Sequence, residues 1–176
     1  MSTVIASVDR RSPAQLAGIK PGEQLLTING HEIIDVLDYR FYGYDADSHL
    51  TLREPNGAQR AVHIRKQEGQ DLGLNFDTYL MDEMRSCATH CIFCFVDQMP
   101  PGMRQTLYFK DDDARLSFLL GNYITLTNLT EREAQRIIDL HICPINVSVH
   151  TTDPQLHCTM LGNKNAGRSL EYIRAF

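Results

Sequence analysis

Three cysteines lie within one stretch of eight residues, Cys87-Ala-Thr-His-Cys-Ile-Phe-Cys94, which we call the cysteine loop. Thiolates are soft ligands, so such a cluster suits zinc or an iron–sulfur cluster. A structural zinc site is closed by four ligands, usually arranged as two closely spaced pairs. Here the second pair is missing: His90 lies inside the loop, whereas Cys143 and Cys158 are distant along the chain. The spacing therefore supports zinc only weakly.

An iron–sulfur cluster held by three thiolates is the other interpretation. Ferredoxin patterns supply four cysteines to a cubane, so three cysteines leave one iron without a protein ligand. Such an iron can bind a cofactor. The loop resembles the signature of the radical S-adenosylmethionine (SAM) enzymes, Cys-x3-Cys-x-aromatic-Cys, with Phe93 at the aromatic position.

This resemblance implies a cofactor set and a reaction. Cys87, Cys91 and Cys94 would ligate a [4Fe–4S] cluster, and the remaining iron would chelate the methionine moiety of SAM. Homolytic cleavage of SAM would then give a 5′-deoxyadenosyl radical, which abstracts hydrogen from an unknown substrate. Phe93 would contact the adenine side of SAM; its alternative role is that of a core aromatic residue.

Polar residues at the ends of two expected strands are further candidates for contacts to SAM or the substrate. Thr127 and Asn128 stand where the superfamily usually has a glycine-rich segment, but the glycines are absent, so capping of the next helix is an alternative role for this segment. Ser148 and His150 end the following strand, and active sites in these barrels collect at such strand ends. The sequence assigns no catalytic residue.

The first 68 residues read as a small β-rich module with two helices. The stretch "SPAQLAGIKPGEQLLTINGHEI" resembles the bacterial type of PDZ domain, which binds extended peptides at a sheet edge. We expect a peptide, a partner protein or a segment of the same chain as its ligand. The predicted elements are a strand over 4–8, a one-turn helix opened by Ser12-Pro13, a hairpin at Asn29-Gly30, a helix over 35–44 and a hairpin at Asn56-Gly57.

Residues 72–176 alternate between strands and helices, which predicts an α/β domain with a parallel sheet or a (β/α) barrel. The expected strands lie in "LGLNFDTYL", in "NYITLTN" and over 145–149, and Thr130 with Glu133 forms a capping box that opens a helix. A full barrel takes about 200–250 residues, so we expect a truncated, partial radical SAM barrel. A separate chain could complete it.

The whole sequence resembles a bacterial subfamily of radical SAM proteins with an N-terminal PDZ-like domain. Members of this subfamily add a C-terminal iron–sulfur oxidoreductase-like domain of unknown function, and the present sequence reads as an N-terminal fragment of such a protein. The alternative from a different class is a non-enzymatic PDZ-like binding protein whose cysteine loop holds zinc or is vestigial.

Composition excludes several other classes of protein. The chain has 176 residues and a formal net charge of −5, without a cluster of basic residues that would bind nucleic acid or an anionic membrane. Its first 20 residues lack the basic region and the long apolar region of a signal peptide, and no apolar run reaches the roughly 18 residues needed to span a membrane. Five cysteines, an odd number, do not suggest a secreted disulfide framework, so we expect a cytoplasmic protein.

Other chemically capable residues receive structural interpretations. Lys110–Asp113 with Arg115 is expected to form a solvated charged surface; a site for a hard cation is the alternative. Cys143 and Cys158 are expected to be small buried side chains. The histidines of the PDZ-like segment show no ligand spacing; they are His31, His49 and His63.

Overall fold

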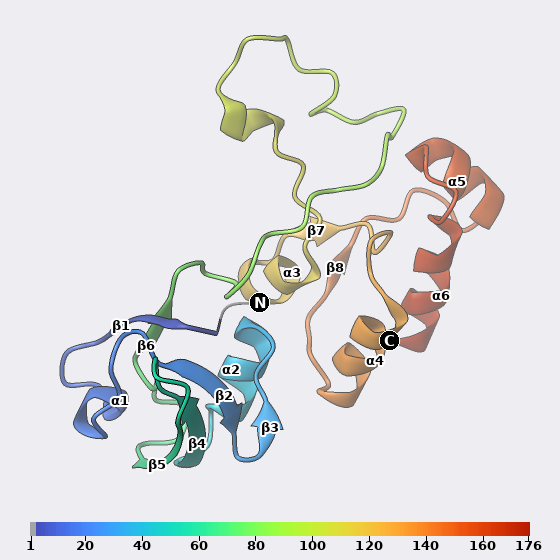
Figure 1. Cartoon of the computed structure of the whole chain (residues 1–176). Helices are drawn as coiled ribbons and strands as arrows, with labels where there is room; N and C mark the ends of the chain where they lie inside the picture. Colours follow the sequence, from blue (N-terminus) through green and yellow to red (C-terminus); the bar gives the residue numbers. More distant parts are fainter. Residues whose placement is uncertain (1–2) are drawn as a thin grey trace. The chain divides into compact units, whose positions relative to one another are not determined.

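The computed structural model describes residues 3–176, which divide into two compact units between Glu83 and Met84 (Figure 1). The first unit contains an antiparallel sheet of order β3-β2-β4-β5 and a separate antiparallel pair, β1-β6. Its elements are β1 (Ile5–Val8), α1 (Pro13–Leu16), β2 (Gln24–Ile28), β3 (His31–Glu32), α2 (Val36–Tyr42), β4 (Asp47–Arg53), β5 (Gln59–Arg65) and β6 (Leu74–Phe76).

Local signals placed most elements of the first unit correctly. Ser12 caps α1 by accepting a hydrogen bond from the Gln15 amide at 3.1 Å, with Pro13 at the first helical position. Asn29 and Gly30 both have positive φ, at 51° and 83°, which is the backbone of a tight hairpin turn between β2 and β3. The expected β-rich module with two short helices is therefore confirmed.

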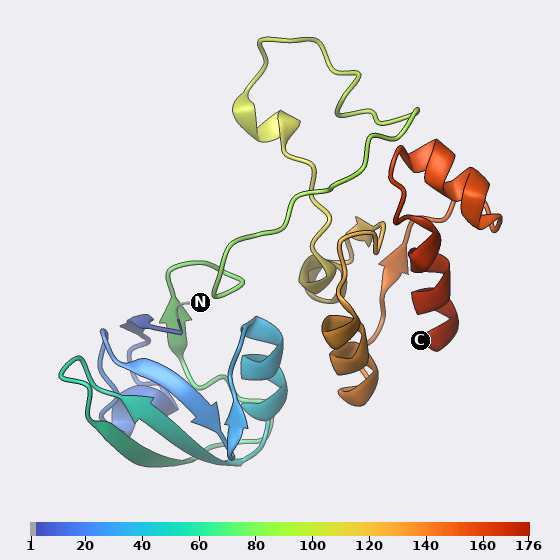
Figure 2. The ribbon, with the colours of Figure 1, turned by 45° about the vertical axis from the view of Figure 1, so that its right-hand side comes forward.

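The long hairpin β4–β5 has one buried and one exposed face, and Figure 2 shows the two strands side by side. Ser48, Leu50 and Leu52 point into the core, where each is at most 1% exposed. The residues between them point outward, because successive side chains of a strand lie on opposite faces. Asp47 and His49 thus belong to the exposed face.

The strand expected in "LGLNFDTYL" is present as β6. Leu74–Phe76 pairs antiparallel with β1, with Ile5 opposite Phe76. Asn75 also donates a hydrogen bond to the Asp9 carboxylate at 2.7 Å. Strand β1 has unpaired backbone groups at its edge that need a partner. The sequence shows that β6 is apolar, but not which strand it pairs with.

The second unit contains one parallel strand pair and several helices. A long loop carrying η1 precedes α3, as Figures 1 and 2 both show. Tyr123 and Ile124 of β7 pair with Asn146 and Val147 of β8, and α4 connects the two strands. The elements are η1 (Gln105–Tyr108), α3 (Ala114–Leu120), β7 (Tyr123–Ile124), α4 (Glu131–Asp139), β8 (Asn146–Val147), α5 (Pro154–Leu161) and α6 (Gly167–Ala175).

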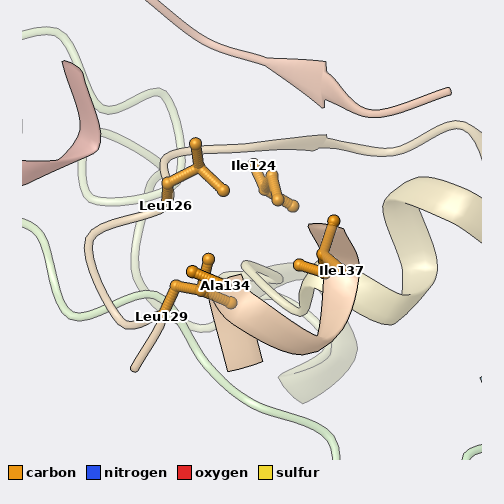
Figure 3. Close-up of a cluster of buried hydrophobic side chains, with 5 residues drawn as sticks. All are labelled: Ile124, Leu126, Leu129, Ala134 and Ile137. Atoms are coloured by element: carbon orange, nitrogen blue, oxygen red, sulfur yellow. The ribbon is translucent and has the colours of Figure 1, made fainter. Parts of the chain in front are cut away.

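This β7–α4–β8 segment confirms the expected strand–helix–strand alternation. The capping box of α4 is present, because the Glu133 amide donates to Thr130 Oγ1 and the Thr130 amide donates to the Glu133 carboxylate at 2.9 Å. The apolar face of α4 packs beneath β7 in a small core (Figure 3), formed by Ile124, Leu126, Leu129, Ala134 and Ile137. The partial radical SAM barrel stays a prediction.

The acidic run is buried, so its interpretation as a solvated surface was wrong. Asp112 and Asp113 are each 1% exposed. Asp112 accepts hydrogen bonds from the Thr125 amide and hydroxyl at 2.6 and 2.7 Å, whereas Asp113 caps α3 and accepts from the Arg115 guanidinium at 2.7 and 2.9 Å. Burial raises the pKa of Asp112; for Asp113 the effect of burial is outweighed by hydrogen bonds from Arg115 and Arg85, which lower the pKa.

These hydrogen bonds bear on the alternative interpretation of the acidic run, a binding site for a hard cation. Both carboxylate oxygens of Asp112 and of Asp113 already accept hydrogen bonds from groups of the chain. Asp111 is occupied in the same way, by the Asp113 amide at 3.1 Å and by the Asn122 side chain. The three carboxylates therefore serve to fasten this segment to α3 and β7.

We predict that Glu133→Gln destabilises the chain in a pH-dependent way. Burial alone would raise the pKa of Glu133, but hydrogen bonds from Arg85 and Thr130 lower it to about 2. A lowered pKa contributes stability above the unfolded pKa, about 4.3, which is lost as the pH falls toward the folded pKa. The variant should lose roughly 2 kcal/mol of unfolding free energy at pH 7, and the loss should shrink between about pH 4.5 and 2.

Urea titrations from pH 7 to pH 2 measure this difference. Glu131→Gln is the matched control, since the Glu131 side chain is 83% exposed in its pair with Arg168 and such pairs contribute little. An equal loss for both variants, or a loss for Glu133→Gln that does not change with pH, would contradict the assigned role of the ion pair.

Candidate functional site

A cavity of about 730 Å³ lies in the second unit between the cysteine loop and the strands β7 and β8. Its wall combines thiols, aromatic rings and a few polar groups. The sequence-predicted site residues that line it are Cys87, Cys91, Phe93, Cys94, Ser148 and His150. Six of the eight predicted residues therefore face one space, although the loop and the strand end are far apart in the sequence.

The three loop cysteines are free thiols, each half-buried. The hydroxyl oxygen of Thr89, a residue only 2% exposed, lies 2.9 Å from Cys87 Sγ and 3.2 Å from Cys91 Sγ. A backbone hydrogen bond of 3.0 Å from the Cys94 amide to the Cys91 carbonyl forms the turn that brings the third thiol round. Burial raises the pKa of Cys87, and the bond to Thr89 opposes this shift.

Lys110 supplies positive charge to this group of thiols. Its Nζ donates to the Thr89 carbonyl at 2.9 Å and to Asp97 Oδ2 at 3.0 Å, so it bridges two parts of the loop. Burial alone would lower the pKa of Lys110, but Asp97 and the neighbouring thiolates, Cys94 and Cys87, raise it. A cation at this place offsets the negative charge of thiolate ligands.

Sequence reasoning missed Lys110, Thr89 and Asp97. Lys110 heads the acidic run, and we had assigned the whole run to a solvated surface. Only Thr89 could have been found from the sequence. It lies two residues from both Cys87 and Cys91, so its hydroxyl can reach both sulfur atoms.

The loop is held in place by the C-terminal end of α5. The His90 amide donates to the Leu161 carbonyl at 2.9 Å, and the Ile92 amide donates to the Met160 carbonyl at 3.0 Å. Asn163 also donates to the Ala88 carbonyl at 3.3 Å. Next to these bonds, Gly162 ends α5 with a φ of +58°, and a Cβ atom there would lie 2.5 Å from the His90 oxygen.

Two histidines stand behind the aromatic residue of the loop. The Phe93 and His150 rings are 4.3 Å apart between centroids, and His157 follows at 6.4 Å from His150. His157 is fully buried; its Nε2 lies 3.3 Å from Ser169 Oγ, whereas its Nδ1 has no hydrogen-bond partner among residues 3–176. Burial and the nearby His150 lower the pKa of His157, which favours the neutral imidazole.

The remaining predicted residues occupy different positions. Ser148 reaches the cavity from the end of β8, where its amide donates to the Ile124 carbonyl at 2.9 Å. Thr127 and Asn128 do not line this cavity: Thr127 Oγ1 lies 2.8 Å from Thr125 Oγ1, and Asn128 donates to the Ser86 carbonyl at 3.3 Å. Their assignment as cofactor contacts stays a prediction. Capping of α4 falls to Thr130.

The other two cysteines are not part of the cavity wall. Cys143 is exposed, so its expected burial was wrong; it lies in the turn after α4, beyond the apolar face of that helix. Cys158 is half-buried, and its sulfur accepts a hydrogen bond from the Gly167 amide at 3.3 Å. The site thus offers three thiols.

The separation of the three sulfurs bears on the choice of metal. Sulfurs that share one tetrahedral zinc ion lie about 3.8 Å apart, since the Zn–S bond is about 2.3 Å. Among residues 3–176, the loop cysteines do not form a group whose ligand atoms all lie within 4.8 Å of one another. A four-iron cubane binds each thiolate through a different iron and so spreads them more widely. The three thiols therefore fit a cubane in which one iron has no protein ligand.

Comparison with known proteins identifies both parts of the sequence. A family model described as a Radical SAM-like domain matches residues 66–176, and a PDZ domain model matches residues 4–53. The chain therefore belongs to the radical SAM-like family and carries a PDZ domain at its N-terminus. A search of curated proteins gives no match. Within the described part of the chain, no helix has the length and apolar character to cross a membrane.

We predict that Gly162→Ala displaces the cysteine loop. The added methyl group would meet the His90 carbonyl at 2.5 Å, so the hydrogen bonds from His90 and Ile92 to α5 should weaken. Amide hydrogen exchange of residues 88–94 should become faster, as measured by mass spectrometry.

Gly102→Ala is the matched control. Gly102 lies in the long loop that begins at the cysteines. Its φ is +87°, but nothing lies within 4 Å of a Cβ atom there. Both variants carry the strain of a left-handed alanine, about 1 kcal/mol, and only Gly162→Ala carries the clash. Unchanged exchange of residues 88–94 in Gly162→Ala would refute the proposed anchoring.

Proposed function

We propose that this chain binds a [4Fe–4S] cluster through Cys87, Cys91 and Cys94, and that SAM bound there is cleaved homolytically to act on an unknown substrate. One observation carries the proposal: three free thiols, with no fourth cysteine among the described residues of the cavity wall, face the same space as Phe93 and His150. Family membership supports the same reaction class.

The chain's own groups prepare the thiols for metal binding. Thr89 donates one hydroxyl proton, which it can direct to either Cys87 or Cys91, and so stabilises one thiolate at a time. Lys110 offsets the added negative charge from within the cavity wall. Both groups lower the pKa of Cys87 and so oppose burial, which raises it; a metal cluster requires the deprotonated thiol.

The rest of the cavity is suited to a cofactor with an aromatic base and charged groups. Phe93 and His150 offer ring surfaces for stacking on adenine, and Ser148 adds a hydroxyl at the end of β8. Apolar side chains of the long loop form part of the wall; they are Phe95, Val96, Leu107 and Phe109. When bound, the reduced cluster would supply the electron that cleaves the sulfonium bond of SAM.

The β7–α4–β8 segment would then be the start of a partial radical SAM barrel. Its two strands are parallel, and the cavity lies beside the residues that follow them, Thr125 and Ser148. This is the end of the sheet at which such barrels build their sites. The remaining strands, from the same or a separate chain, would supply the substrate pocket. The ligand of the PDZ domain would be a peptide, a partner protein or a segment of the chain itself.

We predict that each of the substitutions Cys87→Ala, Cys91→Ala and Cys94→Ala abolishes assembly of the cluster. After anaerobic reconstitution with iron and sulfide, the unsubstituted protein should contain about four irons and four sulfides per chain. Its reduced form should give an electron paramagnetic resonance signal that shifts when SAM is added, because SAM reaches the iron that lacks a protein ligand.

Cys143→Ala and Cys158→Ala serve as controls and should retain the cluster, since neither residue lines the cavity. A colourless protein that contains zinc, or a cluster that survives all three loop substitutions, would contradict the proposal. Such a result would favour a non-enzymatic PDZ-like binding protein.

We further predict that Phe93→Ala and His150→Ala weaken SAM binding more than cluster assembly. The loss of one stacking surface should raise the dissociation constant roughly tenfold, whereas the iron content should stay close to that of the unsubstituted protein. Thr159→Ala provides the comparison, because Thr159 lies on α5 and does not line the cavity. The stacking role is wrong if Thr159→Ala weakens SAM binding as much as Phe93→Ala does.

A further inference from the structure

Two histidines and one aspartate meet on the exposed face of the β4–β5 hairpin. His49 and His63 lie directly opposite each other in the antiparallel register, and Asp47 precedes His49 by two residues, so all three side chains leave the sheet on the same side. We had found no ligand spacing among the histidines of this segment. The pairing of the strands, rather than the spacing along the sequence, brings them together.

The three side chains converge closely. The His49 and His63 rings stack in parallel with centroids 4.3 Å apart and an interplanar angle of 4°. Both Nε2 atoms approach the same oxygen, Asp47 Oδ1; His63 is hydrogen-bonded to it and His49 Nε2 lies 3.5 Å away. One atom from each of these residues can be chosen so that all three atoms lie within 4.8 Å of one another.

The strands hold this arrangement rigidly from below. The residues next to the ligands along each strand point into the core, where Ser48, Leu50, Val62 and Ile64 are all buried. Seven consecutive residue pairs join β4 to β5, from Asp47–Arg65 to Arg53–Gln59. The backbone positions of the three side chains are therefore fixed, and only their exposed side-chain torsions are free to adjust.

We propose that Asp47, His49 and His63 form a binding site for a first-row divalent metal ion such as zinc, separate from the cysteine loop. Two imidazole nitrogens and one carboxylate oxygen suit zinc, nickel or copper, whereas calcium and magnesium require oxygen ligands. Three protein ligands leave one position of a tetrahedral ion open to water or to an outside donor. The site is independent of the proposed SAM chemistry.

The geometry needs only a small adjustment to accept the ion. Ligand atoms around a tetrahedral zinc lie about 3.3 Å apart, given metal–ligand bonds of about 2.0–2.2 Å. The separation of 3.5 Å between His49 Nε2 and Asp47 Oδ1 is already suitable. Rotation of the exposed His63 side chain would lengthen the contact between His63 Nε2 and Asp47 Oδ1 to the same range. Arg65 is the one competing cation among the residues paired with Asp47, but its Nε faces the second carboxylate oxygen, Oδ2, at 3.8 Å.

Zinc titration of the full chain tests this site. The thiols that would compete are removed first, in the background Cys87→Ala, Cys91→Ala, Cys94→Ala and Cys143→Ala. Isothermal titration calorimetry should then show one zinc ion per chain, and His49→Gln or His63→Gln should weaken binding roughly tenfold or more. Magnesium chloride at the same concentration should give no binding.

His31→Gln is the matched control, because His31 is exposed on the neighbouring hairpin and stacks on Tyr42 at 4.1 Å, away from the three ligands. It should bind zinc as the background does. Histidine ring signals in the nuclear magnetic resonance spectrum should shift for His49 and His63 when less than one equivalent of zinc is added. The proposal is overturned if no zinc binds, or if the ion that binds is unaffected by both His49→Gln and His63→Gln.

Discussion

The segment Lys110–Asp113 holds the second unit together. It is the point at which the long loop that begins at the cysteines returns to the sheet, and it binds the start of that loop directly: the Cys87 amide donates to the Lys110 carbonyl at 2.6 Å, and the Ser86 hydroxyl donates to the same oxygen at 3.1 Å. Closing a loop of this length costs conformational entropy, which these bonds must offset. Because the next residues fasten β7 and α3, the same segment connects the thiols to the rest of the unit.

This arrangement explains how acidic side chains can be buried close to three thiols. Buried carboxylates are tolerated when their oxygens accept hydrogen bonds, as those of Asp112 and Asp113 do. Their oxygens accept hydrogen bonds from Thr125 and Arg115, on the elements that follow, while the lysine at the head of the run donates to the loop. The lysine of this short segment therefore binds the cysteine loop, whereas its buried aspartates fasten α3 and β7.

Sequence reasoning succeeded where structure is set by neighbouring residues. The Asn29-Gly30 turn, the Ser12 cap of α1 and the Thr130 capping box all depend on contacts within a few residues, so their signals can be read directly. It failed where distant segments decide. The partner of β6, the α5 anchor of the cysteine loop and the meeting of His49 with His63 depend on packing and register. Asp97 and Lys110 were missed for the same reason, since their contact joins residues that are distant along the chain. Thr89 was missed although its contacts to Cys87 and Cys91 are local.

The pairing of β1 with β6 has a consequence for how the first unit forms during synthesis. One edge of β1 meets a segment that is made soon after it, because Val4 bridges to Gln24 and the Ile5 amide donates to the Glu23 carbonyl at 2.8 Å. The other edge pairs with β6, where Ile5 is opposite Phe76, so it stays open until the chain has been made almost to the end of this unit. The hairpins β2–β3 and β4–β5 join neighbouring segments and close smaller loops. The strand that the ribosome makes first is therefore the one whose pairing is completed last.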